Sequence, residues 1–307
     1  MSLPEIDSTM ILVAGSANLD FVVRASHIPA PGETVLGHDF KTFPGGKGAN
    51  QAVACARAGE AATTIIVALG NDAFAVPLEA SLNEAGVRLH IKRVADQPTG
   101  TAFICVSDDA ENAITVAPGA NHSLHPDDMI APAELGGFSH LLLQLETPMA
   151  TVTAFARAAR LSGVKVVLNA APAQRLPSEL LAVLDVLIVN EGELAVVSNH
   201  TGSIEACLER IPVPCVVVTL GSRGACARVD GALLTQAAFP VTAVDTTGAG
   251  DTFCGAFVAG LSQGLGVAQA LRLASAAGAL ACTKPGAQSS IPTLAEVQSF
   301  LKNSPAS

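Results

Sequence analysis

The stretch Val186–Ser198, VLIVNEGELAVVS, contains one complete unit of the fold. Residues Val186–Val189 are all apolar, which is typical of a strand that is buried on both faces of a sheet. From Glu191 to Ser198 the apolar residues take the spacing of a helix. A continuous apolar strand that leads directly into a helix is the building unit of a parallel sheet covered by helices. The stretch therefore predicts an α/β fold.

Apolar runs of the same kind recur along the chain and alternate with helical patterns. Besides Val186–Val189, we expect buried strands at Met10–Ala14, Thr63–Ala68, Leu141–Leu145, Val164–Leu168 and Val216–Thr219. Besides Glu191–Ser198, we expect helices at Asn50–Ala58, Asp72–Ala85 and Met149–Leu161. The predicted fold class is a three-layer α/β/α domain with a mostly parallel central sheet.

Two segments, Phe21–Phe43 and Thr99–Val116, break this alternation. They alternate polar and apolar residues, contain turn sequences and have no helical period. We expect them to form a small antiparallel sheet that is inserted into the main domain in two pieces. The predicted organisation is a core of residues 1–17, 44–98 and 117–307 and a β lid of residues 18–43 and 99–116. The last helix is expected to begin after Thr293, which has a capping-box partner in Glu296.

The composition limits the possible partners. The chain has 307 residues, of which 50% are apolar and 14% charged, and its formal net charge is −10. It has no basic cluster of the kind that binds the phosphates of nucleic acids. Its apolar runs are too short to span a bilayer, and its first residues lack the layout of a signal peptide. Seven cysteines are scattered singly, which is typical of a reducing compartment. We expect a cytoplasmic protein without nucleic-acid or membrane partners.

In folds of this class, ligands bind beyond the carboxyl ends of the strands. That rule places Gly15–Asp20, Glu146, Asn190 and Gly221 at the functional edge. The first strand is followed by GSANLD, so the GxGxxG fingerprint of dinucleotide-binding proteins is missing, and so is the GxxxxGK[ST] pattern of a P-loop. A hydride-transfer enzyme is therefore disfavoured, and any phosphate must bind elsewhere.

A glycine-rich turn in the stretch Asp245–Phe257, DTTGAGDTFCGAF, offers such a place. Glycines permit backbone torsions that point consecutive amides at one anion, and the helix that begins near Asp251 adds its positive N-terminal end. We expect an anion hole formed by the amides of Gly248, Ala249 and Gly250. Asp251 would then be the base that accepts a proton from a substrate hydroxyl during phosphoryl transfer. The alternative is that Asp251 only caps the helix and the glycines form a plain turn.

Two segments together resemble a known family. GGKGANQAVACARAG at Gly45–Gly59 and DTTGAGDTFCGAF are similar to the two signature segments of the ribokinase-like sugar kinases, the PfkB family, and stand in the same order. The resemblance extends from Met10 to the last helix. It implies a ribokinase-like fold with a β-sheet lid, a small-molecule sugar and ATP as substrates, and a homodimer formed through the lid. It is strongest to members that transfer the γ-phosphoryl group of ATP to the 5-hydroxyl of D-ribose.

On the sugar side, the resemblance is carried by GSANLD, GGKGAN and QLETP. Carboxylates and amides of this kind suit the hydroxyls of a polyol. The implied sugar contacts are Asn18, Asp20, Gly46, Lys47, Asn50, Glu146 and Asp251.

On the nucleotide side, NEGE resembles the NxxE motif of the family, and TLGSRG resembles the loop that lines ATP. The implied nucleotide contacts are Asn190, Thr219, Gly221, Ser222, Gly224, Gly250 and Ser275. Glu193 is implied to hold Mg²⁺ through water, which suits an ion that keeps most of its hydration shell. Family members also use K⁺, and the implied ligands are Asp245, Thr247, Ala281, Lys284, Gly286 and Ser290.

Other functions stay open at this point. The sequence departs from many ribokinase-like enzymes at Cys254, Thr246–Thr247 and Lys284–Pro285, which leaves the sugar undecided. A kinase for 2-deoxyribose, fructose or adenosine is the nearest alternative, although the absence of Tyr and Trp disfavours a nucleoside pocket. A non-catalytic sugar or nucleotide sensor is the alternative from another class, and it predicts a decayed base or anion hole.

Overall fold

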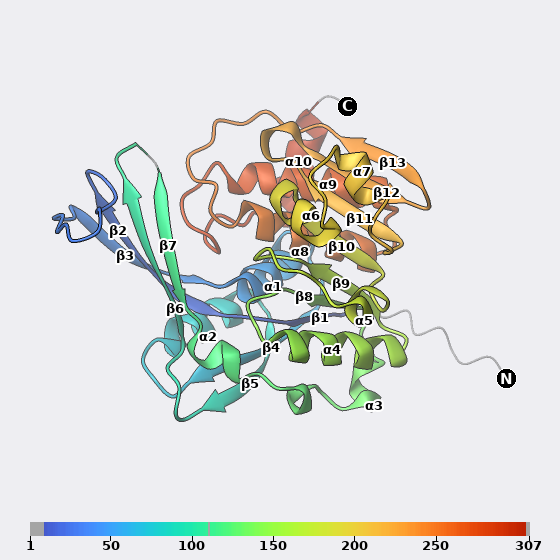
Figure 1. Cartoon of the computed structure of the whole chain (residues 1–307), viewed down its shortest axis with the longest axis horizontal. Coiled ribbons are helices and arrows are strands. Elements are labelled where there is room, and N and C mark those ends of the chain that lie inside the picture. The colour runs from blue at the N-terminus through green and yellow to red at the C-terminus, as the bar shows by residue number, and fades with distance from the viewer. Residues whose placement is uncertain (1–8, 110, 305–307) are drawn as a thin grey trace.

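A computed structural model describes residues 9–109 and 111–304 of the chain. Residues 1–8 and 305–307 of the predicted core, and residue 110 of the predicted lid, lie outside the described residues. The main body is a nine-stranded sheet between two layers of helices, and a four-stranded sheet projects from one side of it, at the left of Figure 1. The predicted α/β class, with a mostly parallel sheet and a smaller second sheet, is confirmed.

The nine-stranded sheet is parallel from β11 to β5 and ends in an antiparallel hairpin, β12–β13. Its strands, in spatial order, are β13 (Ala232–Gln236), β12 (Ala225–Val229), β11 (Cys215–Thr219), β10 (Val186–Asn190), β9 (Lys165–Asn169), β8 (His140–Leu143), β1 (Ile11–Ala14), β4 (Thr63–Gly70) and β5 (Arg88–Val94). All six strands expected from apolar runs are present. The expectation missed the two edge strands, β5 and β13, which carry exposed residues, and β12, whose short apolar run is interrupted by Arg228.

Side chains alternate across the sheet, so each strand supplies both cores. In β1, Ile11 and Val13 face one apolar cluster, and Leu12 and Ala14 face the other. The helices over the first cluster are α1 (Lys47–Arg57), α2 (Ala75–Glu84), α8 (Ala249–Ser262), α9 (Val267–Ala281) and α10 (Leu294–Asn303). Those over the second are α3 (Pro132–Leu135), α4 (Met149–Leu161), α5 (Ser178–Leu181), α6 (Glu191–Ser198) and α7 (Ile204–Leu208). The 3₁₀ turns are η1 (Gly119–Ser123), η2 (Pro126–Asp128) and η3 (Gly221–Arg223).

The capping box expected at the last helix is present. The Thr293 hydroxyl accepts a hydrogen bond from the backbone N–H of Glu296 at 3.3 Å, and a Glu296 carboxylate oxygen accepts from the Thr293 N–H at 2.7 Å. Two N–H groups that would otherwise lack an acceptor are thereby satisfied, which fixes the start of α10.

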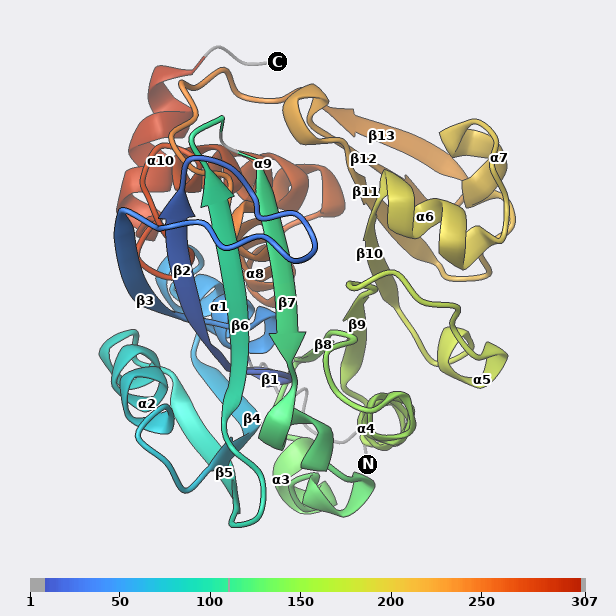
Figure 2. The same ribbon diagram turned by 60° about the vertical axis from the view of Figure 1, so that its left-hand side comes forward.

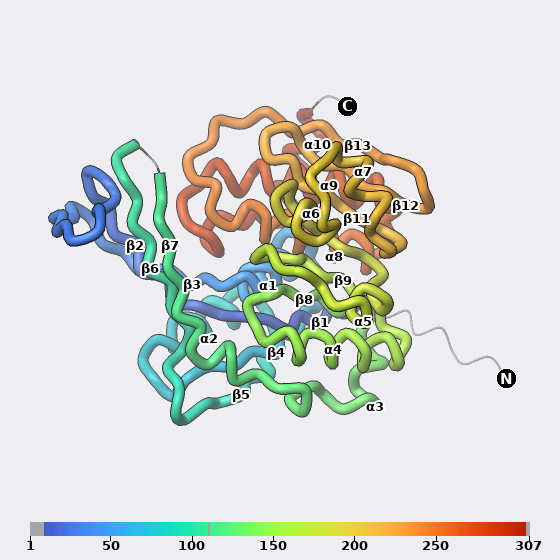
Figure 3. The backbone as a smooth tube through the Cα atoms, viewed as in Figure 1, coloured from blue at the N-terminus to red at the C-terminus, as the bar shows by residue number. Residues whose placement is uncertain are grey.

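The smaller sheet has the strand order β3 (Asp39–Gly45), β2 (Asn18–Ala25), β6 (Gly100–Ser107) and β7 (Asn112–Ala117). The prediction of an antiparallel sheet is wrong in one respect, because β2 and β6 pair in parallel. The two hairpins leave the main body next to one another and run in the same direction (Figures 2 and 3). Their first strands therefore meet in parallel, and each return strand lies on the outside.

Helices α1 and α8 approach each other closely because Gly255 has no side chain. A Cβ at Gly255 would lie 2.4 Å from the Cβ of Ala54 and 2.6 Å from the carbonyl oxygen of Gln51. The thiol of Cys55 also donates to the Gly255 carbonyl at 3.4 Å. This contact places the buried side of α1 directly against the first turns of α8.

We predict that Gly255→Ala lowers the free energy of unfolding by roughly 1–3 kcal/mol, because the added methyl group would force two buried helices apart. Gly136→Ala is the matched control, since Gly136 has helical torsions and a Cβ there would meet its nearest atoms only at 4.0 Å. Chemical denaturation of both variants is the measurement. Equal stability of the two variants would contradict the proposed steric role of Gly255.

Candidate active site

The site lies where the order of the parallel strands reverses direction. Strand β1 pairs with β4 on one side and with β8 on the other, so the later strands are added to the sheet on opposite sides of β1. Such a switch point opens a crevice at the carboxyl ends of the strands. Gly15 follows β1 at this edge and Gln144 follows β8. The N-termini of α1, α6 and α8 and the ends of β9, β10 and β11 supply further residues of the site.

Asp251 lies in the first turn of α8 and is held by two amides of α1. The Nδ2 of Asn50 donates to Oδ2 of Asp251 at 2.9 Å, and the Nε2 of Gln51 donates to Oδ1 at 2.9 Å. The helix cap is Gly248, which has φ 73° and lies in the left-handed region. Asp251 is therefore not the capping residue, and its carboxylate is oriented by side chains far away in the sequence.

The three amides of the predicted anion hole are not equivalent. The Ala249 N–H donates to the carbonyl of Thr246 at 3.2 Å, so it is engaged in the turn. The Gly250 N–H belongs to the first helical turn, whose amides have no acceptor within the helix. A Cβ added at Gly250 would meet no atom within 4 Å, so the space in front of this residue is open. Gly250 therefore presents its amide to an anion more directly than Ala249 does.

Lys47 and Glu146 connect the two predicted sugar segments. The Oε2 of Glu146 accepts the backbone N–H of Lys47, the first residue of α1, at 3.0 Å, and it also accepts the hydroxyl of Ser16. Glu146 is thus a carboxylate at the N-terminus of α1, which the helix dipole favours. The Lys47 ammonium lies near Asp251, Glu146 and Glu193, and the charges of these groups raise the pKa of Lys47. Lys47 is partly buried in the site.

Asn18, at the base of the smaller sheet, has a partner that the sequence did not reveal. Its Oδ1 accepts from the Nδ2 of Asn121 at 2.8 Å, while the Oδ1 of Asn121 accepts the N–H of Ala17 at 3.0 Å. Both asparagines are buried, and nothing in the sequence around Asn121 marks it as part of a site. Because Asn121 donates to the oxygen of Asn18, the orientation of this amide is set, and its NH₂ group is the end that can donate to a ligand.

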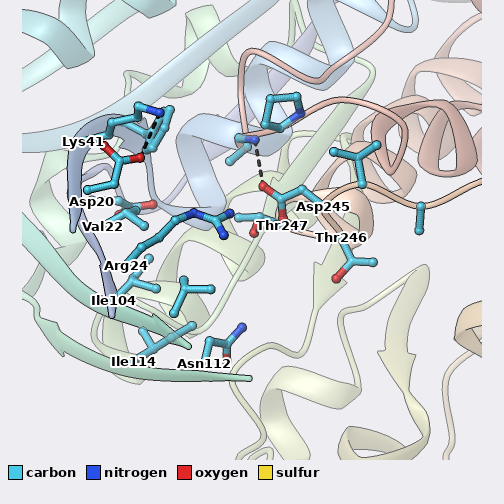
Figure 4. A pocket seen from close by; sticks show the side chains of 18 residues that line it. Asp20, Val22, Arg24, Lys41, Ile104, Asn112, Ile114, Asp245, Thr246 and Thr247 are labelled. Carbon is cyan, nitrogen blue, oxygen red and sulfur yellow. Dashed lines mark hydrogen bonds and ion pairs between the residues drawn. The ribbon is translucent and has the colours of Figure 1, made fainter. Parts of the chain in front are cut away.

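Asp20 faces a cavity of about 400 Å³ between the smaller sheet and the core (Figure 4). Its carboxylate lies on the backbone of the neighbouring strand, and a Cβ at Gly45 would lie 2.1 Å from its Oδ2. Burial, together with the negative charges of Glu146 and Asp251, raises the pKa of Asp20 from 3.8 to about 7. A proton at this carboxyl is therefore exchanged near neutral pH.

A second cavity, of about 170 Å³, contains the predicted base and the predicted phosphate contacts together. It is lined by Lys47, Asn169, Ala171, Ile188, Asn190, Glu193, Thr219, Gly248, Gly250, Asp251 and Cys254. Asn190 and Glu193 form a capping box at α6, in which the N–H of Asn190 donates to Oε2 of Glu193 and the N–H of Glu193 donates to Oδ1 of Asn190, both at 2.8 Å. The NH₂ group of Asn190 is left for a ligand. Burial raises the pKa of Glu193.

The residues present suit a magnesium ion bound through water. In the described ranges, no group of three or more His, Cys, Asp or Glu side chains is placed to hold a metal directly. Glu193 presents one carboxylate at the cavity wall, and Mg²⁺ needs few protein ligands when phosphates and water complete its shell.

The two glycines of the predicted nucleotide loop have different structural reasons. Gly221 has φ 57°, and a Cβ there would meet no atom within 4 Å, so this glycine faces open space. Gly224 has φ 100°, and a Cβ there would lie 2.1 Å from the carbonyl oxygen of Gln236. The packing of the β12–β13 hairpin thus already requires a glycine at 224. Ser222 is exposed on η3, and the hydroxyl of Ser275 in α9 is buried without a hydrogen-bond partner among the described residues.

Three of the predicted potassium ligands are brought together at one loop. The Oδ1 of Asp245 accepts from the N–H and the hydroxyl of Thr247 at 2.9 and 2.6 Å, and its Oδ2 accepts the Gly286 N–H at 2.9 Å. Although burial acts in the opposite direction, these hydrogen bonds lower the pKa of Asp245. Figure 4 shows Arg24 reaching from β2 toward Thr247. The carboxylate is therefore ionised and held in place, which suits oxygen ligation of a weakly hydrated cation.

The other three predicted ligands are engaged elsewhere. The Ser290 hydroxyl is fully buried and donates to the carbonyl of Ala287 at 2.8 Å. The Ala281 carbonyl accepts the N–H of Lys284 at 3.3 Å, and the Lys284 ammonium pairs with Glu296 at 3.0 Å. Carbonyl oxygens have a second lone pair, so these bonds leave them able to bind a cation.

The chain is similar to known proteins along nearly its whole length. The model of the pfkB family carbohydrate kinases matches residues 8–294. The chain is 39% identical over 304 residues to the ribokinase of Haemophilus influenzae, with 95% of this chain and 98% of the relative covered. It is 38% identical over 295 residues to that of Lactococcus lactis, with 96% and 97% covered.

Solved structures are similar along the same length. A ribokinase from Thermotoga maritima superposes with a TM-score of 0.90 at 38% identity, with 96% of this chain and 99% of that chain covered. An Arabidopsis thaliana ribokinase, solved in complex with ribose and ATP, gives a TM-score of 0.88 at 33% identity, with 96% and 99% covered. The resemblance inferred from the two signature segments is confirmed. The chain belongs to the pfkB family of carbohydrate kinases, which are phosphotransferases that act on sugars.

Proposed function

We propose that the protein transfers the γ-phosphoryl group of ATP to the 5-hydroxyl of D-ribose. The observation that carries the proposal is the arrangement at the mouth of α8. There, the carboxylate of Asp251 is fixed by two amide donors and lies beside the open amide of Gly250 and the ammonium of Lys47. The similarity to ribokinases along nearly the whole chain supports ribose as the acceptor and ATP as the donor.

In the proposed reaction, Asp251 orients the 5-hydroxyl and accepts its proton as the sugar oxygen bonds to the γ-phosphorus. The bond between that phosphorus and the β–γ bridging oxygen breaks, and ADP leaves. The Gly250 amide and the N-terminus of α8 stabilise the equatorial oxygens of the phosphoryl group in transfer. Lys47 supplies a positive charge at the same place.

The sugar is proposed to bind between the smaller sheet and the core. Asn18 donates from its NH₂ group, and Asp20 and Glu146 accept from sugar hydroxyls. Gly46, Lys47 and Asn50 complete the contacts at the start of α1. We assign the two hairpins, residues 18–43 and 99–116, the role of a lid that excludes water from the transfer. Phe40 and Phe103 on this lid are 61% and 54% exposed, which supports a homodimer that covers them.

The nucleotide is proposed to lie along Asn190, Thr219, Gly221 and Ser222, with Ser275 near the base. Bound Mg²⁺ would neutralise phosphate charge, and Glu193 would hold its water shell. The Asp245 loop is proposed to take K⁺, which would keep the adjacent glycine turn in shape. In the described part of the chain, no helix is long and apolar enough to cross a bilayer. We propose a cytoplasmic location.

The function is tested by ADP release with ATP and Mg²⁺ over a panel of ribose, 2-deoxyribose, fructose and adenosine, each with K⁺ and with Na⁺. We expect release that depends on ribose and is faster with K⁺, because K⁺ suits the oxygen ligands around Asp245. Turnover of another acceptor would overturn ribose and keep the mechanism. Nucleotide binding without turnover of any acceptor would favour a sensor.

We predict that Asp251→Asn lowers kcat by at least about 10²-fold, because an amide cannot accept the proton of the hydroxyl. The nucleotide should still bind, since Asp251 is proposed to face the sugar. Single-turnover kinetics and titration calorimetry with ATP would measure the two effects. Turnover close to that of the unaltered protein would refute Asp251 as the base.

The raised pKa of Asp20 predicts a stability effect with a definite sign. Since its folded-state pKa is about 7 against an ordinary 3.8, the folded protein binds this proton more tightly than the unfolded chain does. The stabilising contribution is therefore complete below pH 3.8 and lost as the pH rises through 7. Asp20→Asn, which cannot ionise, should be more stable than the unaltered protein at pH 8.5, by on the order of 2 kcal/mol, since partial exposure reduces the full effect.

Chemical denaturation at pH 5.5 and at pH 8.5 would measure this difference, which should shrink at the lower pH. Asp127→Asn is the control, because Asp127 is exposed on η2. The same variant should weaken sugar binding at both pH values. A stability gain that does not depend on pH would contradict the buried charge at Asp20.

A further inference from the structure

A row of buried amides leads away from Asp251 into the core, and the reaction proposed above does not use it. Gln51 in α1, Asn169 at the end of β9 and Gln144 after β8 are 0%, 7% and 1% exposed. The Nε2 of Gln51 donates to Asp251 and also to the Oδ1 of Asn169, both at 2.9 Å. The Oε1 of Gln51 accepts from the Nε2 of Gln144 at 2.7 Å. Asp251, Asn169 and Gln144, from separate elements, thus all bind the side-chain amide of Gln51.

These contacts allow the Gln51 amide a single orientation. Its NH₂ group faces two acceptors, Asp251 and Asn169, and its oxygen faces a donor from Gln144. Reversal of the amide would place its oxygen against two acceptors and its NH₂ group against another NH₂ group. Asn169 is fixed in turn, since its Nδ2 donates to the Ile188 carbonyl at 3.2 Å.

Gln144 keeps its orientation at a cost. Its Oε1 is buried and has no hydrogen-bond partner among the described residues. The atom lies against the backbone of Gly15, where a Cβ would be only 2.0 Å away. A buried acceptor without a partner costs on the order of 1–3 kcal/mol, and such a group calls for an explanation. The explanation we offer is the hydrogen bond of the same side chain, in which the Nε2 of Gln144 donates to Gln51 and sets the orientation of the Gln51 amide.

We propose that Gln144 is a positioning residue for phosphoryl transfer that acts on Asp251 through Gln51. With Asn50 on one carboxylate oxygen and Gln51 on the other, the carboxylate plane cannot rotate, and its remaining lone pairs stay directed at the incoming hydroxyl. Gln144 does not line the cavity that holds Asp251. Its loss should therefore slow the transfer step and leave the binding of both substrates intact.

The proposal rests on the proposed sugar-kinase activity, and the two can fail separately. The unaltered protein is first assayed on the acceptor panel, and the variants are then compared on whichever acceptor it turns over. Because Gln144 donates its hydrogen bond to Gln51 and does not line the cavity that holds Asp251, the expected effect does not depend on the acceptor being ribose.

The main variant is Gln144→Met, which has a similar length and no donor. We expect kcat to fall roughly tenfold while KM for sugar and for ATP stays within about twofold of the original values. Thr151→Val is the matched control, since it removes another buried side-chain hydrogen bond, from Thr151 to the Leu124 carbonyl, in α4. It should lose comparable stability with unchanged kcat. A kcat for Gln144→Met within twofold of the original value would overturn the proposal.

A double-mutant cycle separates positioning from general loosening of the fold. If Gln144 acts only through Gln51, the double variant Gln51→Met with Gln144→Met should have about the same kcat as Gln51→Met alone. Losses that multiply would overturn the proposal.

Gln144→Glu provides a second readout should the methionine variants fail to fold. The introduced carboxyl donates to Gln51 when protonated and accepts when ionised, so the kcat of this variant relative to the original should fall as the pH rises. A ratio that does not change with pH would overturn the proposal.

Discussion

The site depends on one packing contact, the close approach of α1 to α8 at Gly255. Without a side chain at that position, the two helices lie near enough for Asn50 and Gln51 to donate to both oxygens of Asp251. The hydrogen bonds can form because the two backbones are close, and the backbones are close because Gly255 has no side chain. The absence of a side chain at Gly255, inside α8, thus determines how the carboxylate of Asp251 is held in the first turn of the same helix.

Several charged side chains lie near the contact between α1 and α8, and their surroundings differ. The ammonium of Lys47 lies near the carboxylates of Asp251, Glu146 and Glu193, whose charges raise the pKa of Lys47. Burial and the negative charges of Glu146 and Asp251 raise the pKa of Asp20 to about 7. Glu146 is stabilised instead by the N-terminus of α1 and the Ser16 hydroxyl.

The sequence predicted those features that depend on neighbouring residues. Buried strands such as Val186–Val189 are visible as continuous apolar runs, and the glycine turn before Asp251 is visible as a local motif. The edge strand β5 escaped notice because its charged residues hide the pattern. The parallel pairing of β2 with β6 depends on where two distant segments leave the core.

The sequence did not predict the residues that support the site, for a related reason. Gln51, Gln144 and Asn121 are amides within ordinary helical, strand or turn patterns, and only the folded chain shows which groups they meet. The engagement of the Ala249 amide with Thr246 likewise depends on the exact torsions of the turn.

The clamp formed by Asn121 determines how the smaller sheet can move. It ties Ala17 and Asn18 to η1, and Asn18 pairs with Gly100, so strands β2 and β6 are fixed to the core at their first residues. Any swing of this sheet is then the motion of a lever about its base. Asn18 lies at the pivot and would be displaced less than Arg24, which lies further along β2. A sugar would therefore meet its first contacts in nearly final positions, and closure would add the more distant ones.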